Sequence, residues 1–254
     1  MSGVGKSFFL EQLSRELFDL NPGQAFAVLN FNFEMPSDVI QLRNISGKLH
    51  IPTRQLLSAE NTSLNDEALK GAEDYVENDL SQYPVYYAEH PRTVAEYIQI
   101  CKAFYDIMQV PILILSDHSG LFKTTSDDKG TVEFQENLAK AMMALKKSIP
   151  CTQVILSQLN RDIERAERRI PKHALNYVGK SDLRNSDALF NASDFVGVLH
   201  CPFRLNFPPN SYGPLKLSTN QEDIYLHVVK QRDGQEAIIQ LTADFKNMRL
   251  IDRI

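Results

Sequence analysis

The sequence lacks the features of membrane and secreted proteins. No apolar run approaches the ~20 residues that a bilayer-spanning helix requires. The N-terminal region has no basic segment followed by an apolar stretch, the pattern of a signal peptide. These absences predict a cytoplasmic protein that does not associate with a membrane.

Cysteine is also scarce. The three cysteines, Cys101, Cys151 and Cys201, are far apart and odd in number, which argues against a disulfide framework or a zinc site. Cys101 and Cys151 lie in apolar patterns, so we expect them to be small buried residues.

An excess of positive charge is missing as well. The formal net charge is −5 over 254 residues, which by itself disfavours nucleic-acid binding. A nucleic-acid site is a local basic surface, however, so particular loops would have to supply it. The sequence contains no repeat and no low-complexity linker, and we therefore expect a single domain spanning 1–254.

Apolar runs alternate with amphipathic segments along the chain. The runs that predict strands are 25–33, 84–87, 111–115, 153–156 and 195–199. Helical patterns begin at Phe8 and recur within 38–49, 53–80, 93–108, 132–147 and 185–193. Continuous apolar strands that alternate with helices predict an α/β fold with a mostly parallel sheet flanked by helices. Two further strands, 224–229 and 237–241, surround Asp233-Gly234 and predict a terminal β-hairpin.

The segment Gly3-Val4-Gly5-Lys6-Ser7 matches the end of the phosphate-binding pattern G-x-x-x-x-G-K-[ST]. Glycines let backbone N–H groups face phosphates, and the following helix adds its positive N-terminal end. Lys6 would reach the β- and γ-phosphates, and Ser7 would hold Mg²⁺. The first glycine of the pattern is not in the sequence, so we expect a P-loop truncated at its start. The alternative is a chance turn before a helix.

Carboxylates follow two of the apolar runs. Glu34 ends one predicted strand and Asp117 ends another, and the carboxyl ends of parallel strands meet at one edge of a sheet. Asp117 suits a Mg²⁺-binding role and Glu34 a general base for the attacking water. The alternative for each is an N-cap of the next helix. Together with the P-loop, the functional interpretation is favoured.

Two later segments carry polar groups suited to sensing or completing such a site. Gln158 follows the 153–156 strand, where its amide could contact a γ-phosphate and report its loss. Lys230 and Arg232 lie at the predicted hairpin and could reach the ATP of a neighbouring subunit as an arginine finger. The alternatives are an ordinary strand exit and a solvated turn.

The order of these motifs resembles that in DnaB-type replicative DNA helicases, in their C-terminal RecA-like ATPase domain. The segments 157–161 and 181–184 are specific to those helicases, whereas the P-loop is not. The resemblance implies a RecA-like P-loop NTPase that binds ATP and Mg²⁺ and assembles with itself as a homo-hexameric ring. It further implies translocation on single-stranded DNA and unwinding of duplex with 5′–3′ polarity, with a helicase loader or primase as additional candidate partners.

The resemblance also implies roles for individual residues. Phosphate and nucleotide binding falls to Gly3, Gly5, Lys6, Ser7 and Asp117, with Ser7 and Asp117 as Mg²⁺ ligands. The catalytic set is Glu34 as base, Gln158 as γ-phosphate sensor, and Lys230 and Arg232 acting in trans.

Two loops, 119–130 and 161–181, correspond to the DNA-binding loops of the family. The predicted DNA contacts are Arg161, Arg165, Arg168, Arg169, Lys172 and Lys180. Such phosphate contacts bind without sequence preference and weaken with salt. The alternative is a solvated helix with i,i+4 ion pairs such as Glu164–Arg168.

The sequence departs from the family in three respects. His118 stands where a Tyr is usual, and Asp127-Asp128 makes the first loop less basic than expected. The N-terminal helicase domain is absent from this sequence, which weakens a prediction of primase partnership.

Two other functions remain open from the sequence. A different RecA-like ATPase is disfavoured by the segment 156–161. A nucleotide-binding-defective assembly module is disfavoured because Glu34, Asp117, Gln158 and Arg232 are all retained.

Overall fold

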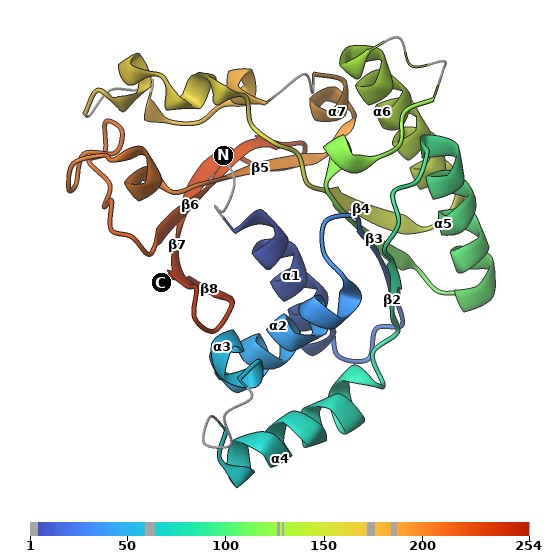
Figure 1. The fold of residues 1–254 in the computed structure, drawn as a ribbon. Helices are drawn as coiled ribbons and strands as arrows, with labels where there is room; N and C mark the ends of the chain where they lie inside the picture. Colours follow the sequence, from blue (N-terminus) through green and yellow to red (C-terminus); the bar gives the residue numbers. More distant parts are fainter. Residues whose placement is uncertain are drawn as a thin grey trace.

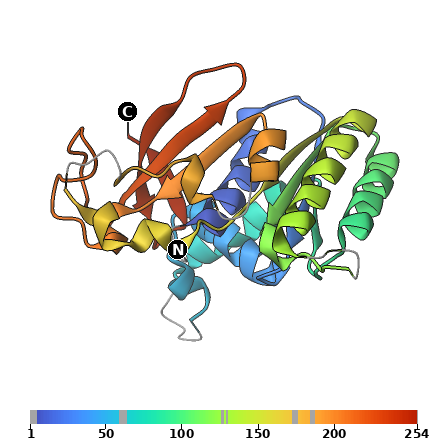
Figure 2. The ribbon, with the colours of Figure 1, turned by 90° about the horizontal axis from the view of Figure 1, so that it is seen from above.

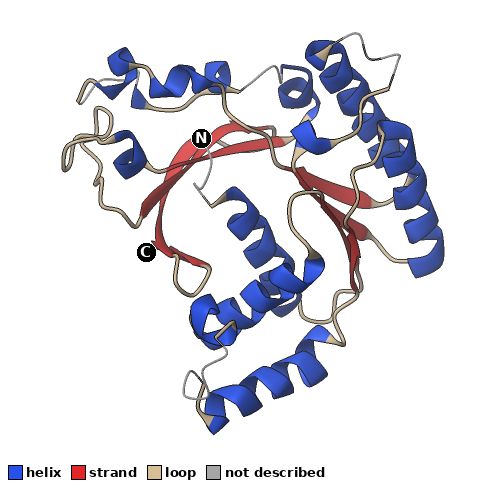
Figure 3. Cartoon of the chain, in the orientation of Figure 1, coloured by secondary structure: helices blue, strands red, loops and turns tan. Residues whose placement is uncertain are grey.

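The computed structural model describes residues 5–58, 64–125, 128, 130–171, 176–183 and 187–253. This part of the chain forms two four-stranded sheets, one parallel and one antiparallel, with helices packed around them (Figures 1 and 3). The predicted α/β class with a parallel sheet flanked by helices is confirmed.

The parallel sheet has the strand order β2-β1-β3-β4. Its strands are β1 (Ala27–Asn32), β2 (Val85–Ala88), β3 (Ile112–Asp117) and β4 (Cys151–Ile155). Figures 1 and 2 show α1 and α2 on one face of this sheet and α5 and α6 on the other. These helices are α1 (Lys6–Leu20), α2 (Ser37–Leu49), α5 (Val94–Met108) and α6 (Thr131–Ser148).

Strand β1 is buried along its whole length because both faces of the sheet are covered. Successive side chains of a strand point to opposite faces. Leu29 and Phe31 accordingly pack in a cluster with residues of α5 and α6, whereas Val28 packs with Leu10 of α1. The even-numbered positions of β1 therefore face the P-loop helix, and these include Asn30, a point that matters for the site.

The antiparallel sheet has the order β5-β6-β7-β8. Its strands are β5 (Phe195–His200), β6 (Asp223–Gln231), β7 (Ala237–Asp244) and β8 (Arg249–Asp252). The predicted hairpin corresponds to β6 and β7, which pair antiparallel. Strand β8 had not been predicted, and β5 pairs antiparallel with β6.

Helix α1 lies between the two sheets and contacts both (Figures 1 and 2). Leu10 packs against the parallel sheet, while Phe8 joins Ile224 in a cluster of the antiparallel sheet. The Gln12 side chain donates to the carbonyl of Leu250 at 2.9 Å and accepts from its N–H at 2.6 Å. Helix α1 is thus fixed to both halves of the molecule.

Shorter elements connect these parts. They are α3 (Thr53–Leu56), α4 (Asp66–Tyr75), the π-helical turn η1 (Val76–Leu80), α7 (Asp187–Ala192), and the 3₁₀ turns η2 (Ser119–Leu121), η3 (Arg161–Glu164), η4 (Ala166–Arg169), η6 (Lys180–Asp182) and η7 (Pro202–Leu205). Cys101 is buried as predicted, Cys151 is only partly buried, and all three cysteines are free. Among the described residues, no helix is both long and apolar enough to cross a bilayer.

Candidate active site

Gly5 leads directly into α1. Its φ of 95° lies in the left-handed region, where a side chain would be strained, and a Cβ there would lie 3.2 Å from the Phe8 ring. The Gly5 carbonyl accepts the first backbone hydrogen bond of the helix, from Phe9 at 2.8 Å. The N–H groups of the first helical turn create a positive end suited to an anion. Gly3 lies outside the described residues.

Lys6 and Ser7 form the first turn of α1 and face the ends of two strands. Burial lowers the pKa of Lys6, and the nearby carboxylates of Asp117 and Glu34 oppose that shift. Both carboxylates are therefore close enough to Lys6 to stabilise its charge.

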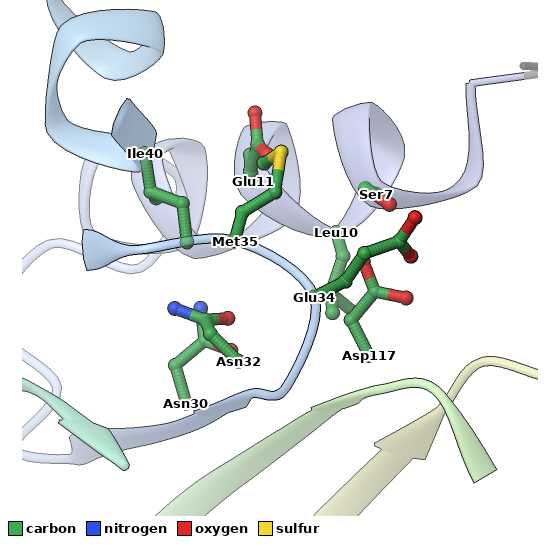
Figure 4. A pocket seen from close by; sticks show the side chains of 9 residues that line it. All are labelled: Ser7, Leu10, Glu11, Asn30, Asn32, Glu34, Met35, Ile40 and Asp117. Atoms are coloured by element: carbon green, nitrogen blue, oxygen red, sulfur yellow. The ribbon is translucent and has the colours of Figure 1, made fainter. Parts of the chain in front are cut away.

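Asp117 ends β3 next to the end of β1, because Asn32 is its partner in the parallel register. Its side chain is 7% exposed and hydrogen-bonds with the Ser7 side chain. Burial raises the pKa of Asp117, while the Ser7 hydrogen bond lowers it. The exposed Glu34 follows β1, and Figure 4 shows its carboxylate beside that of Asp117, below Ser7. The structure thus brings together four residues predicted from the sequence.

A small pocket adjoins this group between α1, β1 and α2 (Figure 4). Its lining is Ser7, Leu10, Glu11, Asn30, Asn32, Glu34, Met35, Ile40 and Asp117. Glu11 is 4% exposed and accepts from Arg43 at 3.0 Å, and burial raises its pKa to about 7. Asn30 and Asn32 are buried, and each has a side-chain polar atom without a hydrogen-bond partner among the described residues.

Sequence reasoning missed these pocket residues, although two signals could have found them. Glu11 lies four positions after Ser7, so it occupies the same face of α1 one turn later. Asn30 and Asn32 share the strand face of Val28, which packs on α1. Polar residues at core positions of a buried strand are a mark of a functional site.

Gln158 lies just past β4, close to the end of β3. Its amide nitrogen is 3.2 Å from Nε2 of His118, the residue that follows Asp117. The Nδ1 atom of the same ring accepts from the N–H of Gly120 at 3.1 Å. His118 therefore connects Gln158 to the loop after β3. The histidine that stands where the family usually has Tyr thus has a structural role.

Lys230 and Arg232 are not among the residues that line the pocket. Lys230 donates from Nζ to the carbonyls of Phe190, at 2.6 Å, and Asn191, at 3.1 Å. Arg232 forms an ion pair with Asp194 at 2.6 Å. Both cations are thus held at the end of α7 and at the residue before β5.

The predicted DNA-binding loop 161–181 contains two 3₁₀ turns, η3 and η4. They stand where a solvated helix was the alternative interpretation of the sequence. Arg168 forks onto the carboxylate of Asp182 with bonds of 2.7 and 3.0 Å, and its side chain is only 17% exposed. It also donates to the carbonyl of Tyr177 at 2.8 Å. The i,i+4 geometry expected for Glu164–Arg168 is therefore not formed, because a buried partner further along the chain holds Arg168.

The other predicted DNA contacts differ in exposure. Arg165 is exposed and pairs with Asp162 at 2.7 Å, and the exposed Arg169 donates to the carbonyl of Glu164 at 2.6 Å. Lys180 is exposed, 3.7 Å from Asp187. Lys172 and the side chain of Arg161 lie outside the described residues.

The donor set at α1 suits a hard cation. The Ser7 hydroxyl and the Asp117 carboxylate supply oxygen ligands, and Mg²⁺ is bound through one or two such groups plus water and substrate phosphates. No cluster of three or more His, Cys, Asp or Glu side chains that could hold a metal occurs in the described part of the chain.

A Gly-Lys-Ser turn at a helix N-terminus, set against the carboxyl ends of parallel strands, is typical of P-loop nucleotide-binding α/β domains. A family model described as the DnaB-like helicase C terminal domain matches residues 1–252, and the chain belongs to that family.

Individual relatives agree with this assignment. The replicative DNA helicase DnaB of Buchnera aphidicola subsp. Schizaphis graminum (strain Sg) is 27% identical over 175 residues, which is 68% of this chain and 35% of the relative. The chain thus spans about a third of the length of that protein.

Two solved structures share the fold. One is the structure of a DnaB-like replicative helicase and its interactions with primase, with a TM-score of 0.83 at 15% identity, covering 100% of this chain and 56% of the other. The second is a solved ATPase domain with a TM-score of 0.82 at 15% identity, covering 100% and 82%. The predicted RecA-like fold and the resemblance to DnaB-type helicases are both confirmed.

Proposed function

We propose that this chain is the ATP-hydrolysing motor domain of a replicative DNA helicase that acts as a homo-hexameric ring on single-stranded DNA. The observation that carries the proposal is the grouping of Lys6, Ser7, Glu34 and Asp117 at the start of α1. Family membership supports it, since the whole chain matches the DnaB-like C-terminal domain.

ATP would bind with its phosphates at the N-terminus of α1. Gly5 and the following N–H groups would contact phosphate oxygens, and Lys6 would neutralise the β- and γ-phosphates. Ser7 and Asp117 would hold Mg²⁺, which would supply positive charge beside the phosphates. Glu34, whose exposed carboxylate adjoins Asp117, would take the proton of the attacking water (Figure 4).

Gln158 would contact the γ-phosphate and transmit its loss to the DNA-facing segment. Two residues later, Asn160 donates from its backbone to the Asp182 carbonyl and from its side chain to the Ser181 carbonyl, both at 2.8 Å. Asp182 in turn holds Arg168. A movement of the segment that follows β4 would therefore also move the turns η3 and η4.

Exposed cations of this segment, Arg165, Arg169 and Lys180, would contact DNA phosphates. Arg168 would act by shaping the segment, since its guanidinium is engaged with Asp182. Gly3, Arg161 and Lys172 keep their predicted roles as phosphate and DNA contacts.

Lys230 and Arg232 would act on the ATP of the adjacent subunit. Neither residue lines the pocket of its own chain, which supports this arrangement. Further partners are a primase and a helicase loader, of which primase is supported by the structure of a DnaB-like relative and its interactions with primase.

The experiment that tests the proposal is ATP hydrolysis with and without single-stranded DNA, at low and moderate salt. We expect DNA to stimulate hydrolysis and the stimulation to fade with salt, because phosphate contacts release counterions. Arg165, Arg169 and Lys180 should be replaced by Gln one at a time. Each replacement should reduce the slope of log K for DNA binding against log salt concentration by about one. Arg54→Gln, an exposed arginine of α3, is the matched control and should not change it. Hydrolysis that ignores DNA would instead favour another RecA-like ATPase.

A further inference from the structure

Asp194 lies at the junction between α7 and β5, and no feature of the sequence singled it out. Its backbone carbonyl accepts from the Arg232 N–H at 2.9 Å. One carboxylate oxygen accepts from the Arg232 guanidinium at 2.6 Å, and the other accepts from the Lys146 ammonium of α6. The Lys146 hydrogen bond, followed by the charges of Lys146, Arg232 and Lys230, lowers the pKa of Asp194. The residue therefore holds Arg232 by both its backbone and its side chain.

Lys230, the second cation of the pair, is attached to the same place. It donates to the carbonyls of Phe190 and Asn191 in the last turn of α7 and lies 5.0 Å from the centre of the Phe190 ring. A cation is stabilised at the C-terminal end of a helix, where carbonyls carry negative charge. Both cations proposed to act in trans thus depend on the position of α7.

The other side of α7 faces the DNA-binding segment. Lys180 lies 4.8 Å from the centre of the same Phe190 ring and 3.7 Å from Asp187 at the start of the helix. Phe190 is therefore contacted by one cation from the DNA-facing segment and one from the end of β6. A displacement of α7 would reach both groups at once.

These contacts leave Arg232 free to act. A guanidinium has five N–H donors, and a bond from one nitrogen to Asp194 leaves others available. The Arg232 side chain is 57% exposed. Holding a long side chain in one direction removes rotamer entropy before the reaction, which is how a positioned group contributes to rate.

We propose that Asp194 is a positioning residue for Arg232, and that the end of α7 links the DNA-facing segment to the cations that act on the neighbouring subunit. This inference rests on the proposed function. The Asp194 side chain is 44% exposed, and exposed ion pairs contribute little to stability. Loss of the pair should therefore affect the reaction and leave the fold intact.

The first test is Asp194→Asn, which keeps the size of the side chain and removes its charge. We expect kcat for ATP hydrolysis to fall at least about tenfold, since removal of an arginine finger costs about 10³–10⁵ in rate and misplacement should cost part of that. The KM for ATP should stay within about twofold, because the pocket at Lys6 is untouched. The control is Glu136→Gln, another carboxylate in an exposed ion pair of α6, which should leave kcat unchanged. Parental kcat in Asp194→Asn would overturn the proposal.

The second test uses mixed assemblies. Lys6→Ala disables a subunit's own nucleotide site but leaves its Arg232 intact, whereas Asp194→Asn does the reverse. Mixing these two poorly active proteins should restore hydrolysis at interfaces that combine the intact halves. A variant that merely misfolded would restore nothing.

The reference mixture is Lys6→Ala with Arg232→Ala. Recovery in the reference but not with Asp194→Asn would overturn the positioning role while leaving the proposed function in place. No recovery in either mixture would show that Arg232 does not act in trans, and the positioning role would then fail with it, while DNA-stimulated hydrolysis by the parent would still support the proposed function. Recovery in both mixtures is the expected result.

Discussion

Burial shifts the pKa of two carboxyl groups beside the parallel sheet and of two histidines in the antiparallel sheet in opposite directions. Beside the parallel sheet, burial raises the pKa of the carboxyl groups of Glu11 and Asp117. In the antiparallel sheet, burial lowers the pKa of His200 to about 3 and that of His227 to about 4. In both halves burial favours the neutral form of these side chains. The carboxyl groups therefore keep their protons to higher pH, and the histidines stay unprotonated to lower pH.

The surroundings explain this difference. Asp117 lies at the carboxyl edge of the parallel sheet near Lys6, and Glu11 on α1 forms an ion pair with Arg43. The histidines lie in an aromatic cluster, with His200 stacked on Tyr212 and His227 2.8 Å from the Tyr212 hydroxyl. The first half carries the proposed nucleotide site, and the second carries the residues proposed to act on the neighbouring subunit.

The largest expected effect is confined to the parallel half. Glu34→Gln should lower the rate of ATP hydrolysis by about 10²–10⁴-fold, because the amide cannot accept the proton of the attacking water. Nucleotide binding, measured by titration, should persist because Lys6 and Ser7 are unchanged. Glu73→Gln, an exposed residue of α4, is the control and should hydrolyse ATP at the parental rate. Equal rates for both variants would remove Glu34 from the chemistry.

The second effect concerns the antiparallel half at low pH. The folded state keeps His200 neutral while the unfolded state binds a proton below pH 6.5, so stability is lost as pH falls from 6.5 toward about 3. The loss from this residue approaches about 5 kcal/mol at the lower limit, at about 1.4 kcal/mol per pKa unit.

His200→Phe should reduce the loss of unfolding free energy below pH 6.5, as measured by denaturant unfolding at a series of pH values. The ring can still stack on Tyr212, and two ring nitrogens without a partner among the described residues are removed. If the variant and the parent lose stability in parallel below pH 6.5, the buried histidine is not the cause.

The smallest expected effect concerns Glu11 in the parallel half, where stability should fall as pH rises. The folded state holds the Glu11 proton up to about pH 7, while the unfolded state releases it near 4.5, so stability falls as pH rises between these values. The expected fall is about 3 kcal/mol. Glu11→Gln should remove it, as measured by unfolding at pH 5 and pH 7.5. Glu16→Gln on the same helix is the matched control, and an unchanged slope in Glu11→Gln would contradict the assignment.

The sequence was sufficient to predict the parallel half because local patterns dominate there. Apolar runs indicate its strands, and the rule that parallel strands end at one edge of a sheet predicts that Glu34 and Asp117 lie close together. The antiparallel half was harder to predict. Strand β8 is four residues long, lies at an edge and is half polar, so it has no clear apolar pattern.

Contacts between distant residues were beyond prediction. Asp194 meets Lys146 and Arg232 from positions 48 and 38 residues away. Arg168 was assigned to a solvated helix or to DNA because its neighbours in sequence are charged, but Asp182, 14 residues later, holds it. Only the folded chain shows which of several exposed-looking cations is already engaged.

The hydrogen bonds between Gln12 and Leu250 have one further consequence. An edge strand offers unpaired N–H and C=O groups to which a strand of another molecule can add. The Gln12 amide bonds to both the N–H and the C=O of Leu250, as a peptide unit of a strand added beside β8 would. The phosphate-binding helix thereby closes β8 at this position against strand addition, and Gln12→Ala should make the isolated protein more prone to aggregate.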